Sequence, residues 1–177
     1  MAMMEAARPI PDVIDDPNAA APLKQRLERV QQIRAYASSD LGLPDNGSYT
    51  RYADLKRPYV VWNVFAAPEL SLQLKQWCYP VVGCAGYRGY FDKAAADAMA
   101  AELRTSGLEV NVAGVPAYST LGWFSDPLLN TFIGGNEGQV AGLVFHELAH
   151  QVVFVGGDTT FNESFATAVE REGVKRW

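Results

Sequence analysis

The 177-residue chain has the composition of an ordinary globular protein, with 49% hydrophobic and 20% charged residues, and this excludes a disordered or fibrous one. Its net charge of −5, without any basic run, argues against a nucleic-acid partner. No apolar stretch approaches the ~20 residues that a membrane-spanning helix needs. The first residues also lack the apolar core of a secretory signal.

The first part of the chain predicts an extended lead-in and then a helix. Residues 1–19 are rich in Pro, Asp and Ala and are expected to be extended. Pro22 suits the first turn of a helix, and apolar residues follow it at helical spacing. Gly42 and Pro44 are expected to end this helix before a turn at residues 45–47.

Short β-branched and aromatic runs predict three strands in the middle of the chain. They cover residues 59–65, 71–77 and 86–91. Between the second and third strands lie Cys78 and Cys84, and a disulfide between them would indicate an oxidising compartment. Two unpaired buried thiols are the alternative, because sequence alone does not fix the Cα separation that a disulfide requires.

The next segments predict a helix and a further strand. Asp92 is a good N-cap, and Gly107 marks the end of the helix that follows it. Residues 108–112 alternate in polarity as a strand does, so strand, helix and strand predict one crossover unit in a mixed sheet. Residues 114–127 are too rich in Gly and Pro for a central strand, and we expect a loop or an edge strand that could hold an extended peptide.

The strongest chemical signal is the pattern His-Glu-x-x-His, formed by His146, Glu147 and His150 in the apolar run from Val140 to Val155. It contains both histidines of the chain. Positions four apart lie on one face of a helix, so the two imidazoles can bind one Zn²⁺. Glu147 can then reach a water on the metal and act as the general base. The alternative is a helix that has this pattern by chance.

A zinc ion held by two histidines needs a third protein ligand and leaves its fourth position to water. Glu163 is the best candidate, since it lies thirteen residues after His150, across a Gly-Gly turn and early in a second helix. A first-turn glutamate favoured by the helix dipole is the alternative. Asn162 is expected to cap this second helix. Glu170 is the reserve ligand, and together with Asp158 it is a candidate to orient the histidines, unless it is merely solvated.

Such a site predicts peptide hydrolysis, in which Glu147 takes a proton from the zinc-bound water and passes it to the leaving amine. Tyr118, in the loop or edge segment, is a candidate to stabilise the oxyanion, although a tyrosine there could serve packing alone. An aminopeptidase also needs a carboxylate for the substrate's α-amine, and the spacing does not select among Glu69, Asp126 and Glu137. An endopeptidase with an open cleft and a metal-binding regulatory module without significant turnover are the alternatives.

Long, specific segments distributed over nearly the whole chain also match a known pattern. They include Leu-Pro-Asp-Asn-Gly-Ser-Tyr and the motif itself, and they span residues 43–49, 59–69, 87–91, 116–124, 146–151 and 161–167. With them the sequence resembles a bacterial family of predicted zinc-dependent aminopeptidases, many of which look like envelope lipoproteins. The resemblance implies a gluzincin-like metallopeptidase with ligands His146, His150 and Glu163 and with Glu147 as base. It further implies a lipid-anchored signal, a location in the bacterial cell envelope or periplasm, and a further C-terminal region.

These observations together predict an α+β fold, with residues 1–177 as a single zincin-like catalytic domain. We expect a small mixed sheet with an edge strand beside the motif helix, followed by the helix with Glu163. The predicted partner is a peptide substrate, with no nucleic acid and with membrane contact only through a lipid anchor. The last helix shows no stop signal before Trp177, from which we expect the natural protein to continue.

Overall fold

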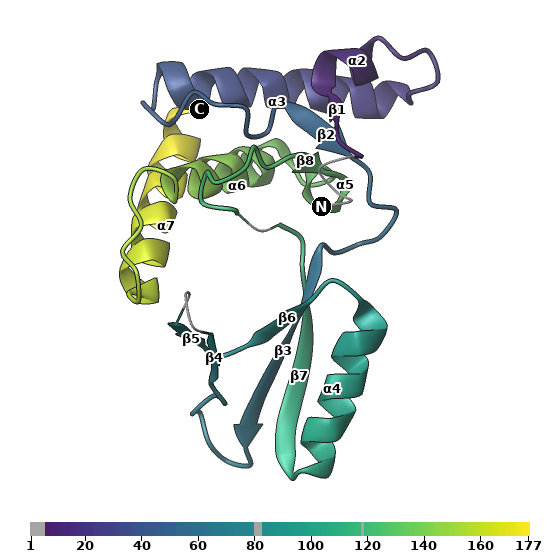
Figure 1. The fold of residues 1–177 in the computed structure, drawn as a ribbon. Coiled ribbons are helices and arrows are strands. Elements are labelled where there is room, and N and C mark those ends of the chain that lie inside the picture. Colours follow the sequence, from purple (N-terminus) through teal and green to yellow (C-terminus); the bar gives the residue numbers. More distant parts are fainter. Residues whose placement is uncertain (1–5, 80–82, 118) are drawn as a thin grey trace. The chain divides into compact units, whose positions relative to one another are not determined.

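A computed structural model describes residues 6–79, 83–117 and 119–177, and these form two compact units (Figure 1). Unit 1 comprises the residues up to Lys56 and those that follow Ala117, whereas unit 2 is Arg57–Ala117. The histidine motif and Glu163 both lie in unit 1. The fold is mixed α/β with small sheets, and the grouping of the two units into one catalytic domain stays a prediction.

Unit 1 is mainly helical. Its helices are α2 (Ile10–Ile14), α3 (Ala21–Ser39), α5 (Asn130–Ile133), α6 (Glu137–Ala149) and α7 (Thr159–Arg176). A small sheet has the order β1–β2–β8, from Arg8–Pro9, Arg51–Ala53 and Leu128–Leu129. The central strand β2 pairs antiparallel with β1 and parallel with β8. Among the described residues, no helix is long and apolar enough to cross a membrane.

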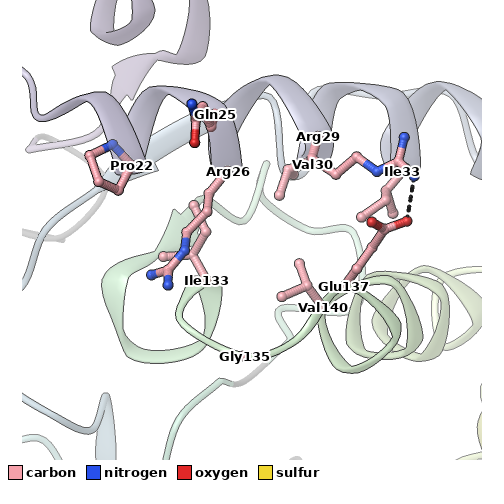
Figure 2. A pocket seen from close by; sticks show the side chains of 10 residues that line it. All are labelled: Pro22, Gln25, Arg26, Arg29, Val30, Ile33, Ile133, Gly135, Glu137 and Val140. Atoms are coloured by element: carbon pink, nitrogen blue, oxygen red, sulfur yellow. Dashed lines mark hydrogen bonds and ion pairs between the residues drawn. The ribbon is translucent and has the colours of Figure 1, made fainter.

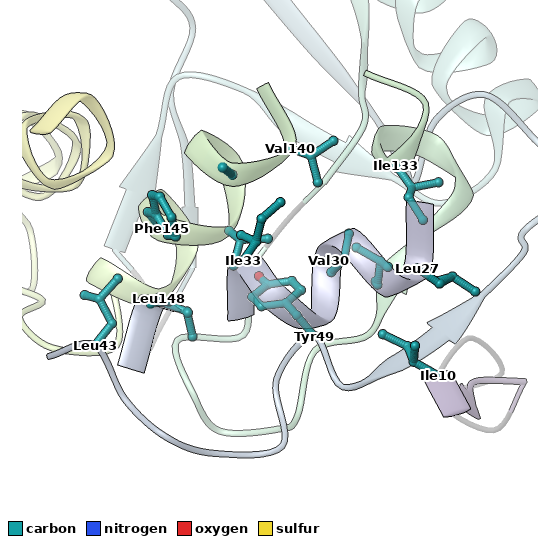
Figure 3. Close-up of a cluster of buried hydrophobic side chains, with 14 of the residues drawn as sticks. Ile10, Leu27, Val30, Ile33, Leu43, Tyr49, Ile133, Val140, Phe145 and Leu148 are labelled. Carbon is teal, nitrogen blue, oxygen red and sulfur yellow. The ribbon is translucent and has the colours of Figure 1, made fainter. Parts of the chain in front are cut away.

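The core of unit 1 lies between α3 and α6 (Figure 3). The apolar stripe of α3 that the sequence predicts is buried, and it packs against the buried face of α6, including Phe145 and Leu148. Burying one such side chain stabilises the fold by about 1.5–3 kcal/mol. This packing therefore fixes the rotation of α6 about its axis, and with it the direction of the motif side chains.

Residues 8–14 correct the prediction of an extended lead-in. Arg8–Pro9 form β1, and α2 follows at once, with a proline in its first turn. Ile10 and Val13 are buried in the core of unit 1. The short helix forms because tertiary burial of these two side chains outweighs a local composition that favours extended chain.

Unit 2 is a three-stranded antiparallel sheet covered by one helix (Figure 1). The order is β6–β3–β7, from Arg88–Tyr90, Val61–Pro68 and Leu108–Val115. Helix α4 (Lys93–Thr105) begins after Asp92, whose side chain accepts a hydrogen bond from the Ala94 N–H as expected. The predicted crossover is present, because α4 joins β6 to β7, but both of these strands pair antiparallel with the central β3.

A hairpin of β4 (Trp77–Tyr79) and β5 (Gly83–Ala85) completes unit 2. A disulfide between Cys78 and Cys84 joins its two strands, so the structure has the disulfide rather than the two unpaired thiols that the sequence also allowed. The predicted strand over residues 71–77 is wrong, because residues 71–76 are irregular and Leu72 is fully exposed. The alternation of apolar and polar residues there does not correspond to a buried face.

Two glycines allow α6 and α7 to pack closely in unit 1. A Cβ atom at Gly173 of α7 would lie 2.7 Å from a ring carbon of Phe145 and 2.9 Å from a methyl carbon of Leu41. On α6, a Cβ atom at Gly142 would lie 3.2 Å from Cγ of Glu170. Side chains at these positions would push the two helices apart.

We therefore expect Gly173→Ala to destabilise the protein, because the new methyl group overlaps a buried ring. The free energy of unfolding should fall by about 1–3 kcal/mol, as for other overpacked cores, and denaturant unfolding measures it. Gly138→Ala on α6 is the matched control, since its Cβ would meet its nearest neighbours at an ordinary 3.6 Å and 3.8 Å. If both variants are as stable as the parent, the close approach does not constrain the helices.

Candidate metal centre

Local sequence sets the limits of α6. The Asn136 side chain accepts a hydrogen bond from the Gln139 N–H, and the Gln139 side chain accepts one from the Asn136 N–H, both at 2.9 Å. This capping box starts the helix at Glu137. The helix ends at Ala149, with His150 as its C-cap in helical conformation. Residues 152–155, the end of the apolar run, lie beyond α6 and are exposed.

The start of α7 corrects two predictions. Asp158, expected beside the histidines, is the N-cap, and its carboxylate accepts a hydrogen bond from the Phe161 N–H at 2.9 Å. Asn162, expected as the cap, is buried inside α7. Its side chain donates to the carbonyl of Val155 and accepts from the N–H of Val155, both at 2.8 Å. These two bonds fasten the α6–α7 connection onto α7, directly beside Glu163.

The side chains of His146, His150 and Glu163 converge on one point, with one ligand atom of each within 4.8 Å of the others. The Nε2 atoms of the two histidines are 3.2 Å apart. The two carboxylate oxygens of Glu163 lie 3.3 Å from Nε2 of His146 and 3.7 Å from Nε2 of His150. Zinc–nitrogen bonds of ~2.0–2.1 Å at tetrahedral angles separate ligand atoms by about 3.3 Å. The three side chains therefore fit a tetrahedral zinc ion.

Glu170 lies on the other side of the His146 ring. Its carboxylate oxygen is 3.0 Å from Nδ1 of His146. A carboxylate there favours a proton on Nδ1 and leaves the lone pair of Nε2 free for a metal. The sequence allows Glu170 to be either a reserve ligand or a group that orients a histidine, and its position matches the second role. Glu163 is the carboxylate in the ligand position.

His150 is more deeply buried, and burial is the main cause that lowers the pKa of its imidazole. A lowered pKa keeps the ring neutral, which is the form that binds metals. Its Nδ1 atom is buried and has no hydrogen-bond partner among the described residues. The two candidate ligands on α6 thus differ in how their rings are held.

Glu147 is mostly buried beside these ligands, and burial raises the pKa of its carboxyl to about 7. His146 opposes this increase in pKa, whereas the charges of Glu163 and Asp126 add to it, and a hydrogen bond with Ser119 lowers it. A general base is most effective when its pKa lies near the working pH. The position and the pKa of Glu147 therefore suit proton transfer at neutral pH.

Sequence reasoning did not predict that Tyr49 and the buried carboxylate of Asp126 interact with each other and with Glu147. Burial raises the pKa of Tyr49 well above its usual value, and the charges of Glu147 and Asp126 act in the same direction. Tyr49 has a φ of 62°, which is rare for a bulky residue. Its backbone N–H donates to the Asp126 carbonyl at 2.7 Å. No periodicity marks such contacts, which join segments far apart in the sequence.

The predicted oxyanion residue Tyr118 lies outside the described residues.

A hollow of about 360 Å³ lies between α3 and the start of α6 (Figure 2). Glu137, on its wall, accepts hydrogen bonds from Arg29 at 2.6 Å and from Trp177 at 2.7 Å. It belongs to the first turn of α6, whereas His146 belongs to the last turn and His150 is the C-cap. Glu137 is therefore committed to these contacts and is a poor candidate to bind a substrate amine at the metal centre.

Two histidines and a glutamate on consecutive helices, with a buried carboxylate beside them, are the donor set that metal-dependent hydrolases use. The comparison with protein families supports a peptidase. The whole chain, residues 1–177, matches the family described as "Putative aminopeptidase", and the protein belongs to that family. Neither the curated proteins nor the solved structures included a match.

We expect Glu170→Ala to weaken zinc binding about 10- to 100-fold, the usual effect of removing the partner of a metal-ligating histidine. Competition with a chromophoric chelator measures this affinity. Glu172→Ala is the matched control, because Glu172 lies on the same helix but pairs with Arg176 instead. Unchanged zinc affinity in Glu170→Ala would contradict an orienting role for Glu170.

Proposed function

We propose that the protein is a zinc-dependent aminopeptidase with a zincin-like fold and gluzincin-like ligands. His146, His150 and Glu163 would hold the ion, and Glu147 would be the general base. The observation that carries the proposal is the convergence of the three ligand side chains, whose ligand atoms lie 3.2–3.7 Å apart. Bound zinc would polarise the peptide carbonyl and lower the pKa of a bound water towards ~7.

The residues of the chain divide the work of hydrolysis. Glu147 accepts a proton from the attacking water and delivers it to the leaving amine. Its burial serves this purpose, because burial raises the pKa of the carboxyl and so favours its taking up a proton. Glu170 orients His146. The charge of Asp126 raises the pKa of Glu147, and a hydrogen bond with Ser119 lowers it.

Membership of the family supports an exopeptidase acting at the N-terminus of a peptide. Such an enzyme needs a carboxylate for the α-amine. Of the three candidates, Glu137 is engaged with Arg29 and Trp177. Asp126 is buried, and it is the one whose charge acts on Glu147. The endopeptidase and the regulatory metal module are the alternatives that the experiments below separate.

We expect Glu147→Gln to lower peptide hydrolysis about 10²- to 10⁴-fold, the typical contribution of a general base. Zinc content, measured by metal analysis of the purified protein, should stay at the level of the parent, because the ligands are unchanged. Glu172→Gln, an exposed substitution on α7, is the control and should keep full activity. Equal rates of peptide hydrolysis in Glu147→Gln and the parent would contradict the assignment as an enzyme and favour the metal-binding regulatory module.

The aminopeptidase and endopeptidase assignments predict different substrates. Peptides with a free N-terminus should be hydrolysed, and removal of zinc with a chelator should abolish this activity until zinc is restored. The same peptides with an acetylated N-terminus should resist, since they lack the charged amine. Mass spectrometry of the products measures both reactions. Hydrolysis of both forms at similar rates would instead assign an endopeptidase.

A further inference from the structure

The two histidines of the motif are held by different means. His146 lies within α6, and its ring nitrogen Nδ1 is 3.0 Å from Glu170. His150 follows the last residue of α6, and its backbone N–H reaches the His146 carbonyl at 3.3 Å. Its Nδ1 atom has no hydrogen-bond partner among the described residues. Helix ends fray more readily than helix interiors, so His150 needs another source of rigidity.

The residue after His150 is clamped from a distant part of the chain. Gln151 Oε1 accepts a hydrogen bond from Asn46 Nδ2 at 2.8 Å. Gln151 Nε2 donates to Ser48 Oγ at 3.4 Å. The same side chain packs on Gly122, where an added Cβ atom would meet Oε1 of Gln151 at 3.4 Å. The side chain of Gln151 is therefore fixed between two loops of unit 1. We call its contacts with Asn46 and Ser48 the clamp.

The loop that holds Gln151, residues 44–49, is itself anchored by a buried cation. Arg34 of α3 is 6% exposed. It donates to the carbonyl oxygens of Ser48 at 2.9 Å, Pro44 at 2.7 Å and Asn46 at 3.0 Å. The Asn46 side chain also accepts a hydrogen bond from the Ser48 N–H at 3.0 Å. Hydrogen bonds from a charged donor are strong, so the loop is a rigid support.

We propose that Gln151 is a positioning residue that fixes His150, and that the 44–49 loop, anchored by Arg34, holds Gln151 in place. The inference rests on the proposed function only in taking His150 as a metal ligand. Glu170 orients one histidine directly, and Gln151 holds the other through the backbone at the end of α6. When the clamp is removed, the last turn of α6 samples more conformations. Metal binding is then weaker, because it must offset the entropy lost when that turn is ordered.

The metal-free protein gives a test that needs neither zinc nor substrate. The chain has two histidines, so NMR resolves one set of ring signals for each. Asn46→Ala and Gln151→Met, which keeps the size of the side chain, should shift or broaden the His150 signals and leave those of His146 in place. Glu170→Ala should do the reverse. Unchanged His150 signals in both clamp variants would overturn the proposal.

Metal binding gives a second test. Asn46→Ala and Gln151→Met should each weaken zinc affinity about tenfold, the lower end for a lost supporting contact. The double variant should lose little more than either single one, because both remove the same contact. The Co²⁺-loaded variants should show altered visible absorption bands. Asn18→Ala is the matched control, since this exposed asparagine donates to Asp16 and lies outside the 44–49 loop.

The outcomes separate this inference from the proposed function. Parent protein that binds zinc without hydrolysing peptides would contradict the proposed function and leave the clamp supported by affinity and NMR. Clamp variants with parental affinity, cobalt spectrum and NMR signals would overturn the clamp even if the parent is an active peptidase. If Gln151→Met does not fold, Asn46→Ala, at an exposed position, provides the same test. Thermal unfolding of the metal-free proteins distinguishes a variant that does not fold from a folded variant with weaker metal binding.

Discussion

The close packing of α6 on α7 is the constraint on which the candidate metal centre depends. One helix supplies two imidazoles and the other supplies Glu163, so the separation of the helix axes determines whether three ligand atoms can surround one ion. The absence of side chains at Gly142 and Gly173 permits this separation, and a buried core beneath α6 fixes its rotation. The ligand geometry is thus a consequence of packing that involves none of the ligands themselves.

The same packing decides which carboxylate has which role. Glu163 and Glu170 lie two turns apart on one face of α7, and α6 crosses that face with the His146 ring between them. One carboxylate therefore meets Nε2 and the other Nδ1. Glu147, on the same helix as the histidines, is directed into a buried setting lined by Asp126 and Ser119, where its pKa rises. Ligand, orienting group and base are all glutamates, and their different surroundings separate their roles.

The local parts of this arrangement were predictable from the sequence, and the long-range parts were not. The spacing of the motif gives one helix face, and the Gly-Gly turn gives a returning helix, so the meeting of His146, His150 and Glu163 follows from short-range rules. The expectation that Asn162 caps α7 is wrong, because Asp158 can fill that position and the buried side chain of Asn162 is needed at Val155. The rule for N-caps identifies suitable residues and does not decide between two of them.

Contacts that join distant segments leave no periodic trace. Tyr49 reaches Asp126 through a backbone bond, and Asn46 reaches Gln151 through side chains more than a hundred positions apart. A turn rich in Asp, Asn and Gly is read from sequence as a local connection, yet here it supports the end of the motif helix. The loops of unit 1 therefore do more than connect helices. Secondary structure brings the ligands together, and irregular segments held by buried polar groups such as Arg34 give that arrangement its rigidity.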